Sequence, residues 1–353
     1  MLSKEQCEEI KEHLNASQNP VFFFDNDCDG LMAFVLMRRY IGRGKGVAIK
    51  SFPELDKTYV RKVEEFNSDY IFILDKPQVS QEFIEEIQSK NIPIVWVDHH
   101  DVEMNFKDKN LFYYNPAKNK NKSNEPTSYL AYKITGNKED MWLAMVGCIA
   151  DNFMPEFYKE NFSKYPELFK KISSSAFEVL YETEFGKLIM MINFALKDRT
   201  SNVVSMINLL VKIKSPFEIL KEDDKNYMIN QRYKYIQNFY TNLLEKAKKI
   251  ARTSNKIVFF QYGGEFSISA DLANELSYCF PGKVIIVAYL KGSIANISIR
   301  GKNIRTITIN AVKTIEGATG GGHENATGAK MSSGDLSKFR EFFEKEIRKN
   351  YKK

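Results

Sequence analysis

The sequence predicts an α/β protein with a parallel sheet in an N-terminal domain, a smaller C-terminal α/β domain and a long helical connector between them. Three apolar runs, at 20–24, 70–74 and 92–97, each end in acidic or imidazole side chains and alternate with helical patterns. A second group of β-forming runs begins only at 256, after a long stretch with helical periodicity. The length of 353 residues accommodates two such domains.

Composition and charge exclude several classes of protein. The chain is 43% hydrophobic and 27% charged, as in globular proteins, and its net charge of +6 favours phosphate-bearing partners. The four cysteines form no Cys-x-x-Cys pair, which argues against a zinc knuckle and a disulfide framework. Residues 1–9 contain no apolar signal core, and no run approaches the roughly 18 apolar residues of a membrane span. We therefore expect a cytoplasmic protein without a membrane partner.

Apolar periodicity and turn residues define the elements of the first domain. Ser3 and Gln6 form a capping-box pattern at the start of the first helix, and Gly42 ends the second helix. Between the first strand and the second helix lies an acidic loop at 25–30. Expected in chain order are a helix at 3–15, a strand at 20–24, a helix at 31–41, a strand at 47–53, a helix at 56–66, a strand at 70–74, a helix at 80–90, and strands at 92–97 and 112–116.

The remainder of the first domain is predicted to be mostly helical. Residues 117–125 are rich in lysine and asparagine and predict a loop, and a helix starting at 126–132 opens with hydroxyl side chains suited to an anion. The apolar segment 142–149 leads to Asp151, which either delivers a further acid to a site or caps a following helix. Residues 156–250 carry apolar stripes at helical spacing, which favour a packed core over cofactor contacts.

The last hundred residues form the second domain. The basic helix at 227–252 is the expected connector; its charge fits a solvated face, with the wall of a nucleic-acid channel as the alternative. The expected domains are therefore 1–226, the linker 227–252 and 253–353. The pattern predicts strands at 256–260, 283–289 and 294–300, and helices at 271–279, 307–314 and 333–351.

Acidic and imidazole side chains gather at the predicted carboxyl ends of the strands, which is the edge where open α/β sheets bind ligands. Three carboxylates at alternate positions of one turn repel one another, so a plain loop would be costly, although a calcium-type or Asx turn stays an alternative. Carboxylate and imidazole ligands without thiolate suit manganese, magnesium or iron better than structural zinc. The candidates are Asp25, Asp27, Asp29, Asp75, Asp98, His99, His100 and Asp151.

A set this rich in acids predicts a dinuclear site. Two ions about 3.5 to 4 Å apart hold a phosphodiester, supply hydroxide near neutral pH and stabilise the leaving oxygen. The reaction class is therefore hydrolysis of a phosphoester or phosphoanhydride.

The glycine run at 320–322 has a different chemistry. Successive glycines allow a backbone to approach a ligand closely and to take positive φ values, so that amide groups form a nest for phosphate. His323 follows the run directly, and Arg300, which ends a predicted strand, is a natural phosphate ligand. A flexible turn is the alternative interpretation of the glycines.

These motifs resemble, in order and approximate spacing, those of the DHH phosphoesterase superfamily. The four N-terminal motifs are represented by the acidic loop at 25–30, Asp75, the triplet 98–100 and Asp151. Residues 298–300 and 320–323 resemble the C-terminal DHH-associated domain of the RecJ-like and nanoRNase-like branch. Two positions depart from the family. Phe23 stands where many members have a histidine that belongs to the ligand set of the first metal, and Asp25 would take its place. Lys76 and Pro77 follow Asp75, where small residues are often found.

The resemblance implies a role for each matching residue. Asp75 would bridge two metals, Asp98 would orient a histidine, and His100 would lie close to the scissile phosphate. The implied metal ligands are Asp25, Asp27, Asp29, Asp75, His99 and Asp151. The residues implied to bind the nucleotide are Arg300, Gly320, Gly321, Gly322 and His323.

The resemblance also implies a function. The leading expectation is a phosphodiesterase with two Mn²⁺ ions, or alternatively Mg²⁺ or Co²⁺, that cuts short or single-stranded nucleic acid to nucleoside monophosphates as a nanoRNase or RecJ-like exonuclease. The alternative is hydrolysis of cyclic or linear dinucleotides. The glycine-histidine motif disfavours a pyrophosphatase, and the nearly intact motifs disfavour a non-catalytic replication scaffold. The sequence does not decide whether the protein forms a homodimer.

Overall fold

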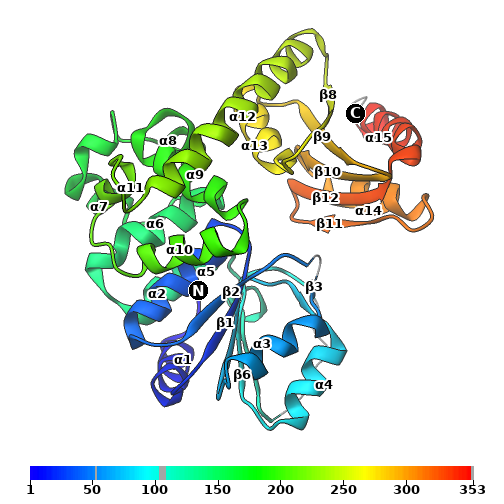
Figure 1. Ribbon diagram of the computed structural model, residues 1–353. Helices are drawn as coiled ribbons and strands as arrows, with labels where there is room; N and C mark the ends of the chain where they lie inside the picture. Colours follow the sequence, from blue (N-terminus) through cyan, green and yellow to red (C-terminus); the bar gives the residue numbers. More distant parts are fainter. Residues whose placement is uncertain (52–53, 103–108, 351–353) are drawn as a thin grey trace. The chain divides into compact units, whose positions relative to one another are not determined.

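The computed structural model of the protein describes residues 1–51, 54–102 and 109–350. The chain forms two compact units, Met1–Tyr233 and Lys234–Lys353. Each unit contains its own five-stranded sheet (Figure 1). The predicted fold class, a parallel-sheet domain followed by a separate α/β domain, is confirmed.

The first unit is organised around a parallel sheet with the strand order β2-β1-β4-β6-β7. Its strands are β1 (Val21–Asp25), β2 (Lys45–Ile49), β4 (Ile71–Leu74), β6 (Ile94–Val97) and β7 (Leu111–Tyr114), with a small pair β3 (Glu54–Leu55) and β5 (Gln78–Val79) beside it. Its helices are α1 (Lys4–Ala16), α2 (Cys28–Ile41), α3 (Val60–Glu65), α4 (Gln81–Ser89), α5 (Thr127–Thr135), α6 (Met141–Ala150), α7 (Tyr158–Lys164), α8 (Ala176–Glu182), α9 (Glu184–Leu196), α10 (Thr200–Leu210) and α11 (Phe217–Leu220).

Alternate residues of the central strands face two separate cores. Phe22 and Phe24 of β1 pack with α2, α5 and α6 on one face of the sheet. Phe23 of β1 and Trp96 of β6 pack with α3 and α4 on the other face. With both faces covered by helices, the carboxyl ends of β1, β4 and β6 remain as the edge that can present polar groups.

Several element boundaries differ from the sequence predictions. Helix α2 begins at Cys28, not at 31, because Asp27 caps it and draws Asp29 into the first turn. The predicted strand 47–53 ends at Ile49, and 52–53 lie outside the described residues. The predicted helix 56–66 is a 3₁₀ turn, Lys57–Tyr59, followed by α3. The predicted loop at 117–125 starts inside a 3₁₀ turn, Pro116–Lys118.

Helix α12 (Tyr227–Thr253) matches the long helix expected at 227–252. The boundary between the two units, between Tyr233 and Lys234, falls within it. In the part of the chain that the structure describes, no helix combines the length and apolar character needed to cross a membrane.

The second unit contains a mostly antiparallel sheet with the order β11-β12-β10-β9-β8, in which only β8 and β9 pair in parallel. Apolar residues of β9 and β10 pack against α14 and α15, and α13 contacts the same two strands. Its elements are β8 (Ile257–Gly263), α13 (Ser269–Cys279), β9 (Val284–Lys291), β10 (Ile294–Arg300), α14 (Arg305–Lys313), β11 (Thr319–Gly322), β12 (Ala326–Ser332) and α15 (Leu336–Asn350).

The glycine run is a strand. Gly320, Gly321 and Gly322 pair with Ala329, Gly328 and Thr327 of β12, so the run is extended and does not have the turn-like backbone expected of a phosphate nest. Only Gly322, at φ 132°, has a left-handed backbone in this run, where a β-carbon would lie 2.5 Å from the Ala326 carbonyl oxygen. Pairing with β12 therefore overrides the weak β-propensity of glycine.

Candidate metal centre

The acidic loop after β1 places its three carboxylates in three different settings. Asp25 is the last residue of β1 and is partly exposed. Asp27 caps α2, accepting a hydrogen bond of 3.0 Å from the Gly30 amide, while Asp29 is buried in the first helical turn. A β-carbon on Gly30 would lie 2.6 Å from the Asp25 carbonyl oxygen, so this tight turn requires glycine.

Asp29 occupies the N-terminus of α5. Its carboxylate accepts hydrogen bonds from the amides of Thr127 (2.7 Å) and Ser128 (2.9 Å) and from the Ser128 hydroxyl. The hydroxyl-rich helix start therefore does bind an anion, as predicted, but the anion is a side chain of the protein. Helix α6 packs closely behind this contact at Gly147, where a β-carbon would lie 3.1 Å from Asp29 Oδ1. A carboxylate has about four acceptor sites, so three donors leave room for a metal.

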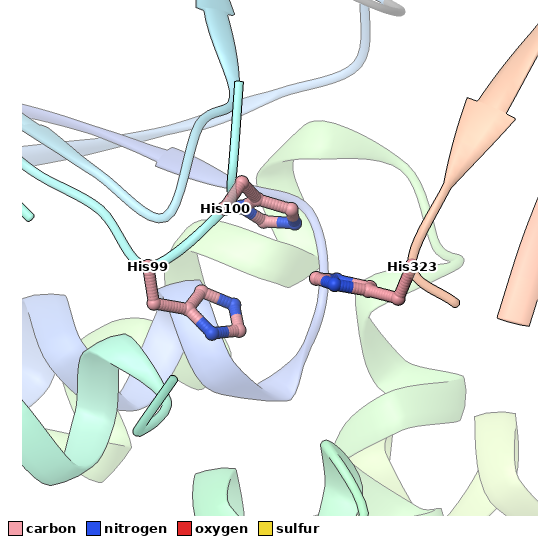
Figure 2. Close-up of side chains that lie close together, drawn as sticks. All are labelled: His99, His100 and His323. Carbon is pink, nitrogen blue, oxygen red and sulfur yellow. The ribbon is translucent and has the colours of Figure 1, made fainter. Parts of the chain in front are cut away.

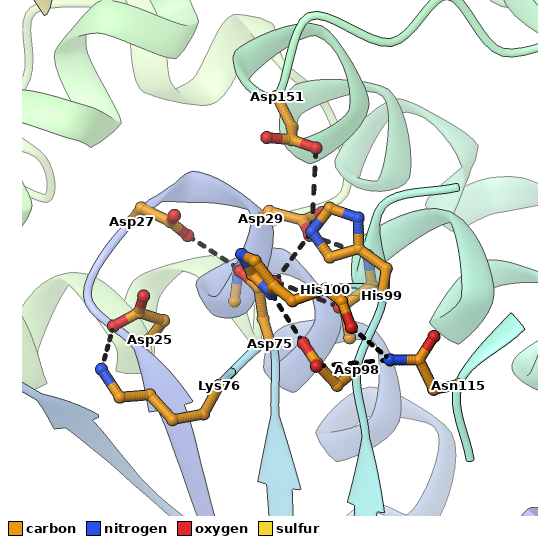
Figure 3. Close-up of polar contacts among 12 residues, drawn as sticks. Asp25, Asp27, Asp29, Asp75, Lys76, Asp98, His99, His100, Asn115 and Asp151 are labelled. Carbon is orange, nitrogen blue, oxygen red and sulfur yellow. Dashed lines mark hydrogen bonds and ion pairs between the residues drawn. The ribbon is translucent and has the colours of Figure 1, made fainter. Parts of the chain in front are cut away.

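Asp75 lies at the centre of the cluster, directly after β4 (Figure 3). It is buried and has a left-handed backbone, with φ 59°, which is uncommon for a residue other than glycine. Its amide donates to the Val97 carbonyl (3.0 Å), and the Thr127 hydroxyl donates to its Oδ1 (3.2 Å). Burial and the negative charges of the neighbouring carboxylates raise its pKa well above the usual value.

The triplet after β6 separates its two imidazoles. His99 Nε2 lies 3.4 Å from Asp75 Oδ1 and 3.9 Å from Oδ2 of Asp151, the residue that follows α6. His100 Nδ1 lies 2.8 Å from Oδ1 of the buried Asp98. Figure 2 shows the rings of His99 and His100 on the loop after β6.

The two histidines differ in protonation. Burial and the positive charge of His100 lower the pKa of His99, so its ring is neutral and carries a lone pair. Burial alone would also lower the pKa of His100, but the Asp98 carboxylate, through its charge and hydrogen bond, outweighs burial and raises it to about 9. A neutral ring is a metal ligand and a protonated ring is a donor to an anion.

Asp27 also has an altered acidity. Loss of hydration within the cluster, together with the charges of Asp25 and Asp29, raises its pKa to about 7, even though the residue retains an exposed surface. Carboxylates that repel one another in this way gain free energy when a cation enters.

One set of ligands suits a divalent cation. A carboxylate oxygen of Asp29, one of Asp75 and a ring nitrogen of His99 lie within 4.8 Å of one another, and all three residues are buried. Asp75, Asp98 and His100 form a second such trio, but the hydrogen bond to Asp98 engages His100 Nδ1 and keeps that ring protonated, so the ring is a donor and not a metal ligand. The donors are oxygen and imidazole nitrogen, the chemistry expected for Mn²⁺ or Mg²⁺.

Sequence reasoning missed several supporting residues. Asn115 Nδ2 donates to the His100 carbonyl (2.9 Å) and contacts Asp98 Oδ2 (3.4 Å), which fixes the triplet from β7. Lys76, noted only as a family departure, forms an ion pair with Asp25. Gly147 gives no local signal, because its role depends on the packing of α6 against α5. An asparagine directly after an apolar strand is the one sequence pattern that points to Asn115.

The C-terminal candidates meet at one end of the second sheet. Arg300, at the end of β10, is opposite Ala326 of β12, and its Nη1 donates to the Thr327 carbonyl (3.4 Å). Its Nε donates to Asn274 Oδ1 (2.5 Å). His323 follows β11 and closes the turn to β12 through its amide, which donates to the Ala326 carbonyl (2.9 Å).

Comparison with protein families agrees with this geometry. Residues 21–151 match the sequence model of the DHH family, N-terminal domain, and residues 253–349 match that of the DHHA1 domain. The chain is a DHH superfamily protein with a C-terminal DHHA1 domain. The first match begins with β1 and ends at Asp151, so it contains every residue of the proposed metal centre. The predicted family is thereby confirmed, and with it membership of a phosphoesterase superfamily.

Solved structures share the fold at low sequence identity. RecJ from Thermus thermophilus, in complex with Mn²⁺, is 16% identical with a TM-score of 0.70; the match covers 98% of this chain and 54% of RecJ. The chain thus spans about half the length of that protein. Exonuclease RecJ bound to manganese is 15% identical, with coverage of 97% and 94% and a TM-score of 0.63.

A third structure, the pGpG-specific phosphodiesterase PggH from Vibrio cholerae, is 13% identical with a TM-score of 0.50. The match covers 94% of this chain and 99% of PggH. A search of curated proteins found no match.

Proposed function

We propose that this DHH protein is a divalent-metal-dependent phosphodiesterase that hydrolyses short or single-stranded nucleic acid to nucleoside monophosphates. The observation that carries the proposal is the buried trio of Asp29, Asp75 and His99 beside the Asp98–His100 pair. A cation held by the trio would neutralise phosphate charge and acidify a water molecule. Mn²⁺ is the expected metal, since the donor set suits it.

The side chains around the phosphate have different proposed roles. His99, with a neutral ring, would act as a metal ligand, and Asp75 would hold the same ion through a carboxylate whose position is fixed by Thr127. Asp98 would keep His100 protonated and would fix its Nδ1, so that Nε2–H is the donor to a phosphate oxygen. This donor stabilises the negative charge that grows on the phosphate as water adds and the ester oxygen leaves.

The second unit would bind the rest of the nucleotide. The proposed ligands are Arg300, the glycine strand and His323, which supply guanidinium, amide and imidazole donors at the same end of that sheet. Asn274 and the Thr327 carbonyl hold Arg300 in place, which lowers the entropy lost when it binds an anion.

A second candidate is hydrolysis of cyclic or linear dinucleotides. It is supported by the match to PggH, a pGpG-specific phosphodiesterase, whose length is covered almost completely by this chain.

Incubation with Mn²⁺ and 5′-labelled RNA and DNA of two to thirty residues would test these alternatives. Loss of long single strands would support a RecJ-like activity, and cleavage confined to the shortest oligomers would support a nanoRNase-like activity. Cleavage of pGpG or a cyclic dinucleotide alone would favour the second candidate. If the protein turns over none of these substrates faster than an Asp75→Ala control does, the proposed phosphodiesterase activity is refuted.

A further inference from the structure

A buried cation lies beside Asp25, at the edge of the acidic cluster. The Lys76 side chain is 1% exposed, and its Nζ lies 3.0 Å from Asp25 Oδ1 and 3.0 Å from the Ser51 carbonyl oxygen (Figure 3). Burial of an ammonium is tolerated only where such partners replace its lost hydration. The lysine backbone is fixed as well, because its carbonyl accepts the Trp96 indole N–H (2.9 Å) and Pro77 follows it.

The carboxylates of the site fall into two sets. Asp29 and Asp75 converge with His99 within 4.8 Å, whereas among the described residues Asp25 and Asp27 join no such trio. Asp25 Oδ1 is contacted by the Lys76 ammonium and by the Asn26 amide (3.0 Å). Asp27 Oδ1 accepts the Gly30 amide as the cap of α2. Asp25 differs from the acids of the trio because its donors include a buried cation, the Lys76 ammonium.

We infer that the Lys76 ammonium takes the place of a second divalent ion, so that the site binds one ion, held by Asp29, Asp75 and His99. A positive charge 3.0 Å from Asp25 neutralises that carboxylate and repels a dication approaching it. The inference rests on the proposed function, because both need an ion at the trio. It replaces the two-ion site expected from the sequence, and Lys76 acts as a positioning residue.

Ion counting on the full chain tests the inference without substrate. Lys76→Met removes the charge and retains the length of the side chain. Metal-free protein is dialysed against Mn²⁺ and measured by atomic emission and electron paramagnetic resonance. We expect one ion with an uncoupled spectrum in the wild type. The variant should gain a second, spin-coupled ion whose affinity is at least about 10-fold above any second site in the wild type, because removing a neighbouring like charge favours the dication. Lys62→Met, which removes an exposed ion pair with Glu65, is the matched control and should still bind one ion.

Asp25→Asn provides the second arm. If the Lys76 ammonium occupies the place of a metal beside Asp25, the Asp25→Asn variant should still bind one ion in the wild-type background. In the Lys76→Met background, the same substitution should remove the second ion that Lys76→Met had gained. Two ions of similar affinity in the wild type would overturn the inference, as would a Lys76→Met protein that is folded by circular dichroism yet binds one ion. If Lys76→Met does not fold, Asp25→Asn alone decides, because loss of the single ion would make Asp25 a ligand. Absence of any ion in the wild type would refute the proposed function as well, which is a distinguishable result.

Discussion

The two sheets of this protein present opposite chemistry at their ends. The parallel sheet of the first unit ends in carboxylates and imidazoles at β1, β4 and β6, whereas the sheet of the second unit ends in Arg300, His323 and a glycine strand. The first arrangement depends on side chains held by buried hydrogen bonds, and the second depends largely on backbone pairing. We therefore expect substitutions in the first sheet to abolish metal binding and chemistry, and substitutions in the second to weaken substrate binding or stability.

The largest effect is expected at the centre of the first sheet. Asp75→Asn keeps the shape of the side chain but removes a charge from the trio, and His99→Ala removes its nitrogen ligand. Each should abolish binding of the ion at the trio and lower kcat by about 10³-fold or more, because the ion supplies several kcal/mol of charge stabilisation. Isothermal titration with Mn²⁺ and turnover of a dinucleotide measure the two effects.

Asp101→Asn is the control for these variants, since Asp101 pairs with Lys118 outside the trio. It should bind metal and turn over substrate as the wild type does. Metal binding that is unchanged in His99→Ala would contradict the assignment of this ring as a ligand.

A smaller effect is expected at Asp98. Asp98→Asn removes the charge that raises the pKa of His100 to about 9, so the imidazole should lose its proton at lower pH. Because the proposed donor is the protonated ring, wild-type kcat should fall as pH rises through about 9, and this limb should move to lower pH in the variant. At neutral pH we expect a loss of about 10²-fold, as for other positioned acids.

Profiles of kcat against pH, recorded at saturating Mn²⁺, measure the shift. A variant that is slower at every pH but has an unmoved upper limb would mean that Asp98 acts only on structure. A wild-type profile that does not fall above pH of about 9 would remove His100 as the donor.

The same contrast explains what the sequence could and could not predict. Strands β1, β4 and β6 were predictable because each is an apolar run that ends abruptly at an acid or at the triplet. The hydrogen bonds from the start of α5 to Asp29 were not predictable, because they join residues about a hundred positions apart that only the packing of the chain brings together. The same holds for the Lys76 side chain, whose burial depends on neighbouring strands.

The glycine run shows a different limit. Three glycines predict a turn or nest from local preference, yet they form β11 because β12 supplies partners in register. Local propensity is a weak guide wherever a distant strand determines the conformation. Arg300 was correctly placed at the end of its strand, since β10 is long, apolar and alternating.

A third prediction concerns the second sheet. His323→Ala should raise KM by about 10-fold with little change in kcat, because a hydrogen bond to a charged group contributes roughly 1.5 kcal/mol to binding. The expected split between KM and kcat distinguishes it from the variants of the first sheet. Steady-state kinetics with a dinucleotide provide the measurement, with His13→Gln on α1 as the control. A fall in kcat at constant KM would instead assign His323 a role in the chemical step.

The smallest effect separates neighbouring glycines of β11. A β-carbon on Gly321 would meet nothing within 4 Å, whereas Gly322 has φ 132° and would bring a β-carbon to 2.5 Å from the Ala326 carbonyl oxygen. Gly322→Ala should therefore lower the free energy of unfolding by about 1 kcal/mol or slightly more, because a positive φ is strained for alanine. Gly321→Ala should leave it within about 0.5 kcal/mol of wild type. Urea unfolding followed by circular dichroism measures both. Equal losses in the two variants would mean that this strand is sensitive to side chains in general, and that its glycines are not required by backbone geometry at a single position.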